Sequence, residues 1–176
     1  REVSAETAIA CAAAEIARGR ADAVLAGGGD IISEFYFNVL ARFRTLSPQN
    51  GGPEGLRPFD ARRNGIVVGE GAGVVCLESL PSAEARGAIP YCEIAGWGLS
   101  AAPSGPTDWP ADPAGPSLAM TRAMAAARVD PGGIDFVSAA ANGGRRSDRL
   151  EAEALARVFP AVGRQPRVSS VKGALG

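Results

Sequence analysis

The sequence contains no histidine among its 176 residues. Histidine is the commonest general base near neutral pH and the commonest metal ligand, so its absence excludes both of its usual roles. The three cysteines, Cys11, Cys76 and Cys92, are scattered and form no Cys-x-x-Cys pair, which argues against a zinc site. We therefore expect neither a metal nor a cofactor. An odd, unpatterned set of cysteines predicts reduced thiols in a cytoplasmic protein.

Long hydrophobic runs and an excess of positive charge are also missing. No stretch approaches the roughly 18 apolar residues that a membrane span needs. The 18 basic and 19 acidic residues give a net charge of −1, which argues against a nucleic-acid partner because such proteins carry a clustered positive face. The chain starts without a charged-then-apolar leader. Both ends interrupt a pattern, so we expect a segment of a longer protein.

Lysine is nearly absent, because Lys172 is the only lysine beside 17 arginines. An ammonium group can change its pKa when it is buried, and a guanidinium group cannot. Lys172 is therefore a candidate functional residue. The alternative is that one lysine remains by chance on an exposed loop.

The sequence does contain a regular alternation of helix and strand patterns, which predicts an α/β fold with buried central strands. Apolar residues at helical spacing predict helices, and short apolar or alternating runs predict strands. Polar segments rich in glycine and proline at 47–55 and 100–115 predict loops, the second of which is a lid candidate. The expected helices are 5–18, 32–43, 81–86, 118–127 and 148–159, and the expected strands are 21–26, 71–79, 90–99, 134–138 and 167–170.

Glycines alternate with other residues in Gly69-Glu70-Gly71-Ala72-Gly73, which follows the segment Arg57-Pro58-Phe59-Asp60. Glycine at such spacing suits a backbone that packs against another backbone at very short range. We therefore expect a close-packed core around Glu70.

Two motifs suggest chemistry but fit a structural role better. Gly27-Gly28-Gly29 follows a predicted strand, but Ile32 replaces the third glycine of a dinucleotide loop. The glycines are better explained by a tight turn. Cys11 lies in the middle of an alanine-rich helix, where nothing depresses the pKa of a thiol, so we expect a small core residue.

Asp148 and Glu151 lie three residues apart at the start of a predicted helix, on one face. Carboxylates there stabilise the positive end of the helix dipole. A solvated charge cluster with Arg145 and Arg146 is equally compatible with the sequence.

Taken together, these segments resemble the β-ketoacyl-acyl carrier protein synthase (ketosynthase) family of the thiolase superfamily, over essentially the whole chain. The most specific segments are Arg57–Asp60 with Gly65 and Gly69–Gly73. The other matching segments are Ala21–Gly28, Leu46-Ser47, Ala85–Ala88, Tyr91–Gly96, Ile134–Ala139 and Val168–Gly173. The resemblance implies a thiolase-like layered αβαβα fold of two similar halves. It implies that residues 1–80 are the latter part of the N-terminal half and 81–176 the beginning of the C-terminal half.

The resemblance also implies where the family's catalytic residues should stand. The family uses a nucleophilic cysteine, two histidines and a lysine, with two acidic residues in a charged network. Counting back from Arg18-Gly19 places the cysteine position at Glu2. The first histidine position falls on Ala140, and the second lies beyond Gly176. Lys172, Asp148 and Glu151 occupy their family positions. The charged network is therefore retained, whereas the nucleophile and the first histidine are substituted.

These substitutions resemble the chain-length factor, a ketosynthase-like subunit without the cysteine that pairs with an active ketosynthase. The resemblance then implies acyl carrier protein, with acyl or malonyl groups on its phosphopantetheine, as a partner. It implies a heterodimer with an active ketosynthase or a homodimer. Two alternatives remain open: a condensing or malonyl-decarboxylating enzyme with an altered site, and a carrier-protein-binding scaffold subunit.

Overall fold

The computed structural model describes residues 3–105, 108–159 and 163–176. It divides into two compact units, one formed by the chain up to Ile31 and Gly71–Ala95, the other by Ile32–Glu70 and Gly96–Gly176. In chain order the elements are α1 (Ser4–Ala17), β1 (Ala23–Asp30), α2 (Glu34–Arg42), β2 (Gly71–Glu78), α3 (Leu80–Ala85), α4 (Ala114–Ala127), the 3-10 turn η1 (Pro131–Gly133), β3 (Phe136–Ser138), α5 (Arg145–Val158), β4 (Arg167–Ser169) and α6 (Lys172–Leu175).

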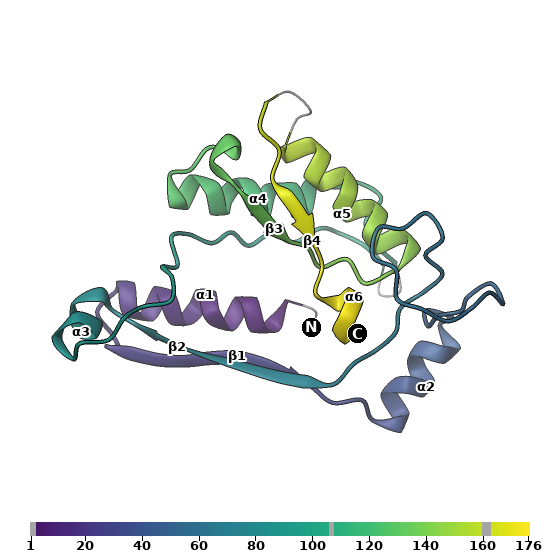
Figure 1. Ribbon diagram of the computed structural model, residues 1–176, viewed down its shortest axis with the longest axis horizontal. Coiled ribbons are helices and arrows are strands. Elements are labelled where there is room, and N and C mark those ends of the chain that lie inside the picture. Colours follow the sequence, from purple (N-terminus) through teal and green to yellow (C-terminus); the bar gives the residue numbers. More distant parts are fainter. Residues whose placement is uncertain (1–2, 106–107, 160–162) are drawn as a thin grey trace. The chain divides into compact units, whose positions relative to one another are not determined.

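The first unit is a two-stranded antiparallel sheet covered by one helix. β1 and β2 pair in register from Ala23–Glu78 to Asp30–Gly71, and α1 packs along both strands (Figure 1). The helix can approach closely because Gly28 faces it. A Cβ on Gly28 would lie 2.9 Å from the Cβ of Ala5, which is closer than two carbon atoms pack. The core here is made of small alanines.

The second unit contains the parallel pair β3 and β4 and the packed helices α4 and α5 (Figure 1). α5 is strongly amphipathic: it buries Leu150, Ala154 and Val158 and exposes its four arginines, whereas one charged residue, Asp148, is buried. None of the helices that the structure describes is long and apolar enough to span a bilayer.

Several expectations for single elements are corrected. Residues 90–99 form no strand in the described parts of the chain, although their side-chain pattern alternates. A strand needs a partner, and Gly96 and Gly98 instead lie against the backbone of α4, where a Cβ on Gly98 would lie 2.7 Å from the nitrogen of Ala123. β1 runs on through its three glycines to Asp30, so the expected turn at Gly27 is wrong.

Burial also differs from the sequence-based expectations. Cys11 is exposed, so it is not a core residue, because α1 turns other positions, Ala10 and Ala12, into the interior. β2 is mostly exposed, because among the described elements α1 packs mainly on β1 and little else covers the faces of this two-stranded sheet. The expectation of buried central strands is therefore wrong for this strand. For the same reason, nothing in the structure lies within 4 Å of a Cβ added to Gly71 or Gly73.

Candidate functional site

The predicted site residues of the C-terminal part lie on two loops that leave the same sheet edge. β3 and β4 are parallel and end at Ser138 and Ser169, so both following loops start at their carboxyl ends. The backbone N–H of Ala139 donates to the carbonyl of Ser169 at 2.8 Å, and the Ser170 hydroxyl donates to the carbonyl of Ala141 at 2.7 Å. These bonds tie the segment that carries Ala140 to the segment that leads to Lys172.

Asp148 is the anchor of this region. It lies in the first turn of α5 and is 1% exposed. Its Oδ2 accepts the backbone N–H groups of Phe59 at 2.9 Å and Gly143 at 3.2 Å, and its Oδ1 accepts that of Asn142 at 3.0 Å. A buried carboxylate is tolerated when donors surround it. Asp148 therefore joins the Arg57–Asp60 segment to the loop before α5.

The Arg57–Asp60 segment adopts an unusual backbone at that junction. Phe59 has φ +60°, in the left-handed region that bulky residues rarely adopt. Such a conformation persists only where neighbouring bonds hold it, and here the Phe59 N–H is bound to the buried carboxylate. At the exposed end of the segment, hydrogen bonds from Arg62 lower the pKa of Asp60 to about 2.

A tight backbone contact reinforces the same junction. Gly65 donates its N–H to the carbonyl of Gly143 at 3.3 Å. Gly143 has φ +81°, and a Cβ there would lie 2.7 Å from the carbonyl oxygen of Gly65. Glycine at both positions lets the two loops touch.

Glu151 lies one turn after Asp148 and binds the backbone at Ala140, the position predicted to correspond to the first histidine. Its Oε1 accepts the backbone N–H of Ala140 at 2.8 Å. Burial raises the pKa of Glu151, and the negative charge of Asp148 adds to that shift, whereas the N–H groups of Ala140 and Ala141 and the charge of Lys172 lower it. The two carboxylates and the lysine thus interact electrostatically.

Ala140 itself brings no chemical group to the site. Its methyl group is exposed, and its only polar groups are those of the backbone. The structure brings together Ala140, Asp148, Glu151 and Lys172 in the second unit. Glu2 lies outside the described residues, so its position relative to them stays a prediction.

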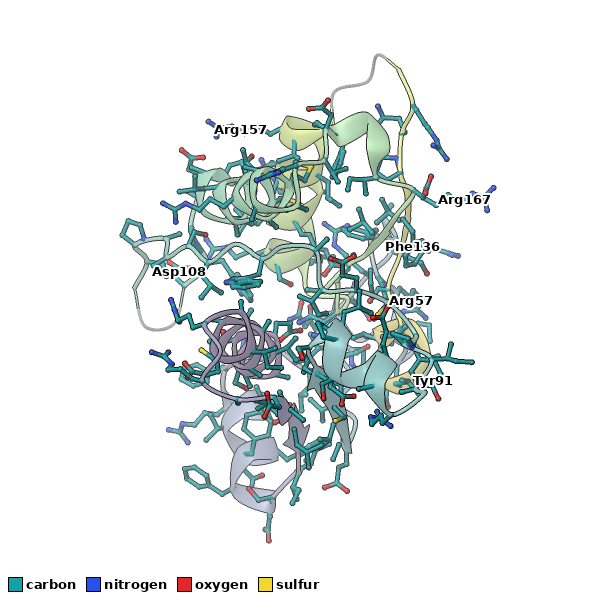
Figure 2. The ribbon with its side chains drawn as sticks, turned by 90° about the vertical axis from the view of Figure 1, so that its left-hand side faces the viewer. Arg57, Tyr91, Asp108, Phe136, Arg157 and Arg167 are labelled. Carbon is teal, nitrogen blue, oxygen red and sulfur yellow. The ribbon has the colours of Figure 1, made fainter. Side chains whose placement is uncertain are left out.

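A groove of about 550 Å³ runs beside this anchor along α5. Asp148 and Arg63 contribute to its polar wall, and Phe59, Leu155, Ala156 and Val168 to its apolar wall. Figure 2 shows Arg157 and Arg167, also of this unit, pointing away from the ribbon. In the described parts of the chain, no group of three His, Cys, Asp or Glu side chains could hold a metal ion.

Asn64 has a structural role that the sequence did not indicate. Asn64 is 2% exposed; its Oδ1 accepts the Ser47 hydroxyl at 2.7 Å, and its Nδ2 donates to Asn50 Oδ1 at 3.3 Å and to the Pro53 carbonyl at 3.2 Å. It therefore ties down the loop predicted at 47–55. The dipeptide Asn64-Gly65 is a turn signal, but it does not indicate which polar groups the asparagine will bind.

The comparison with known families decides the relationship. A family model for the N-terminal domain of β-ketoacyl synthases matches residues 2–83, and the model for the C-terminal domain matches residues 91–176. The chain belongs to the β-ketoacyl synthase family. The boundary expected at residue 80 remains a prediction within that assignment.

Known β-ketoacyl synthases and their relatives match along nearly the whole chain. Nodulation protein E of Rhizobium sp. (strain N33) is 40% identical over 169 residues, which are 96% of this chain and 40% of the relative. The chain thus spans well under half the length of that relative.

Solved structures show the same relationship. The ishigamide ketosynthase/chain length factor has a TM-score of 0.86 at 35% identity, covering 98% of this chain and 41% of its own. A type II polyketide synthase ketosynthase, solved in complex with its acyl-carrier protein, has a TM-score of 0.91 at 26% identity, covering 99% and 44%. The predicted thiolase-like α/β fold is confirmed by these similarities.

Proposed function

We propose that this ketosynthase-like chain is part of a non-catalytic subunit, similar to a chain-length factor, of polyketide or fatty acid synthesis. The observation that carries the proposal is Ala140. The hydrogen bonds of the neighbouring residues Ala139 and Ala141, together with the Glu151 carboxylate, hold its backbone in place. Its side chain is nevertheless only a methyl group. A held position without a functional group fits a preserved scaffold better than an active site.

The chemistry of the substituted positions supports this proposal. A methyl group cannot donate a hydrogen bond to a developing enolate, and the Ala140 N–H is already bound to Glu151. By resemblance, Glu2 stands at the nucleophile position, and a carboxylate cannot take the place of a thiolate in a thioester. Removing the nucleophile of an enzyme that relies on one lowers kcat by several orders of magnitude.

The retained residues then have a structural role. Asp148 binds backbone N–H groups from two loops, and Glu151 binds a third segment. We propose that these two residues, with Lys172, keep the loops of the family site in shape at a subunit interface.

The partners proposed for the subunit are an active ketosynthase, in a heterodimer, and acyl carrier protein with an acyl or malonyl group; a homodimer is the alternative assembly. Support comes from the similarity to a ketosynthase/chain length factor and to a ketosynthase bound by its acyl-carrier protein. We also propose a cytoplasmic location, and a boundary between the two halves near residue 80.

The proposal is tested by acyl loading. The purified full-length protein is incubated with acyl-acyl carrier protein and analysed by intact-protein mass spectrometry, with an active ketosynthase as the positive control. We expect no acyl adduct on the protein and one on the control. A thioester adduct on this protein, released by hydroxylamine, would overturn the proposal.

The alternative hypothesis, an enzyme with an altered active site, is tested separately. Glu2 could imitate an acylated cysteine and favour malonyl decarboxylation, with Ala140 as the observation against it. The full-length protein and its Glu2→Ala variant are compared for release of carbon dioxide from malonyl-acyl carrier protein. An equal rate in the two proteins removes this alternative. Crosslinking the protein to a partner ketosynthase and mapping the contacts separates a chain-length role from a carrier-protein scaffold.

A further inference from the structure

The chain contains three asparagine–glycine pairs, Asn50-Gly51, Asn64-Gly65 and Asn142-Gly143. At such a pair the backbone nitrogen of the glycine can attack the side-chain amide of the asparagine, because glycine has no Cβ to obstruct the approach. The attack needs a glycine nitrogen that is free of hydrogen bonds and an asparagine side chain that can turn towards it. The three pairs differ in both respects.

The pair Asn64-Gly65 is closed to this reaction. Asn64 is 2% exposed, and hydrogen bonds hold both the oxygen and the nitrogen of its amide. The Gly65 N–H donates to the carbonyl of Gly143 at 3.3 Å. The amide and the attacking nitrogen therefore become available only when these bonds open.

The pair Asn142-Gly143 is closed by the buried carboxylate of Asp148. The Asn142 side chain is half-buried, and its Oδ1 accepts the N–H of Gly144 at 3.0 Å and the hydroxyl of Ser147 at 2.9 Å. The Gly143 N–H donates to Asp148 Oδ2 at 3.2 Å. Attack requires that this nitrogen lose its proton, and a carboxylate beside it opposes the negative charge that would form.

The pair Asn50-Gly51 is open. Both residues are exposed, and in the part of the chain that the structure describes the Gly51 N–H donates to no acceptor. Nothing lies within 4 Å of a Cβ added to Gly51, so there is room for the two groups to meet. The Asn50 Oδ1 accepts the N–H of Gly52 at 3.4 Å and Nδ2 of Asn64 at 3.3 Å. Donors at a carbonyl oxygen stabilise the negative charge that an attack on the carbon places there.

We propose that Asn50 is a site of self-modification by deamidation, which the fold leaves open while it protects Asn64 and Asn142. The Gly51 nitrogen forms a bond to Cγ of Asn50, the Cγ–Nδ2 bond breaks, and ammonia leaves with the proton of the Gly51 N–H. Water then opens the cyclic imide at either carbonyl and gives an aspartate or an isoaspartate at position 50. Either product adds a negative charge to the loop at 47–55. The reaction requires only this chain and water, so it is independent of the proposed function.

Peptide mapping tests the proposed selectivity. The full-length protein is kept folded at mildly alkaline pH, and deamidation of each pair is followed over time by mass spectrometry of its peptides. We expect Asn50 to react at least about tenfold faster than Asn64 and Asn142, because the other two react only after their hydrogen bonds open. A rate at Asn50 no faster than at the other two would overturn the proposal.

The same protein unfolded in denaturant is the matched control, because unfolding removes all of these hydrogen bonds. We expect the three pairs to react at similar rates there. A preference for Asn50 that keeps its size in the unfolded chain would overturn the role of the fold.

An Asn50→Gln variant tests the position of the reaction. It keeps the amide and moves it by a methylene group away from the Gly51 nitrogen. The parent should accumulate a more acidic form on anion-exchange chromatography, and the variant should lose most of it. An acidic form that accumulates equally in the variant would place the reaction at another residue and overturn the proposal.

Discussion

At the scale of single residues, Asp148 and Glu151 of α5 have different roles although they lie three positions apart. Asp148 is fully buried and accepts backbone N–H groups from two loops, whereas Glu151 is half-buried and binds the backbone of Ala140 and Ala141 alone. The sequence places both on one helix face. It does not show that their acceptor oxygens bind backbone amides instead of the arginines next to them.

Asp148→Asn should destabilise the folded protein by about 2 kcal/mol, because a side-chain NH₂ group would face at least one of the N–H groups that the carboxylate now accepts. Chemical denaturation of the full-length protein measures the change. Glu153→Gln is the control: Glu153 pairs with Arg149 on the exposed face of α5 at 2.7 Å, and exposed ion pairs contribute little. Equal stability of the two variants would contradict the anchoring role of Asp148.

Glu151→Gln should change how stability depends on pH. Burial raises the pKa of Glu151 above its ordinary value of 4.5, so the folded state holds this proton to a higher pH than the unfolded chain does. Its contribution to stability therefore falls as pH rises from 4.5 through the folded pKa. The variant has no such proton and should lose less stability over that interval. Parallel pH profiles of the parent and the variant, measured by denaturation, would refute this.

At the scale of elements, close contacts decide where the chain can run. The segment at 90–99 has the alternating pattern of a strand, yet Gly96 and Gly98 lie against α4 and no strand pairs with the segment in the described residues. Side-chain pattern indicates which residues share a face. It does not indicate whether a neighbouring strand is available.

Gly98→Ala should destabilise the protein by about 2 kcal/mol, since the new methyl group would overlap the α4 backbone near Ala119 and Ala123. Gly132→Ala provides the comparison, because nothing in the structure lies within 4 Å of a Cβ there. Thermal unfolding of both variants measures the difference. A Gly98→Ala protein as stable as Gly132→Ala would show that α4 does not pack here.

Arg128→Gly should stabilise the end of α4 by about 1 kcal/mol. Arg128 ends the helix at φ +56°, a left-handed conformation that glycine adopts without the cost of a Cβ. Gly87 ends α3 at φ +70°, so Gly87→Ala should have the opposite effect. Denaturation midpoints that move in the same direction in both variants would contradict this explanation.

At the scale of the whole molecule, the sequence predicts the family and the fold class better than it predicts burial. Arg57–Asp60 and Gly69–Gly73 are specific enough to indicate the family, because they combine several constrained backbone positions. The exposure of β2 could not be predicted from the sequence, because a strand pattern does not indicate which other element packs on the strand. The sequence predicts that Asp148, Glu151 and Ala140 belong to one site, and the structure places them together. The left-handed Phe59 that Asp148 binds has no sequence signal of its own.

A match to the family is not in itself a match to the family's reaction. The segments that carry the resemblance fix the backbone of the loops. One example is the close contact of Gly65 with Gly143. Such backbone contacts keep the conformation of the loops whichever side chain occupies position 140. The family match therefore describes the backbone of these loops and does not by itself establish a reaction.

The most direct measurement is condensation itself. The full-length protein is supplied with acyl- and malonyl-acyl carrier protein, alone and together with an active partner ketosynthase, and the β-ketoacyl product is quantified by mass spectrometry. We expect no product above background from the protein alone, and a change in the length of the products when it accompanies the partner. Robust condensation by the protein alone would contradict a non-catalytic role.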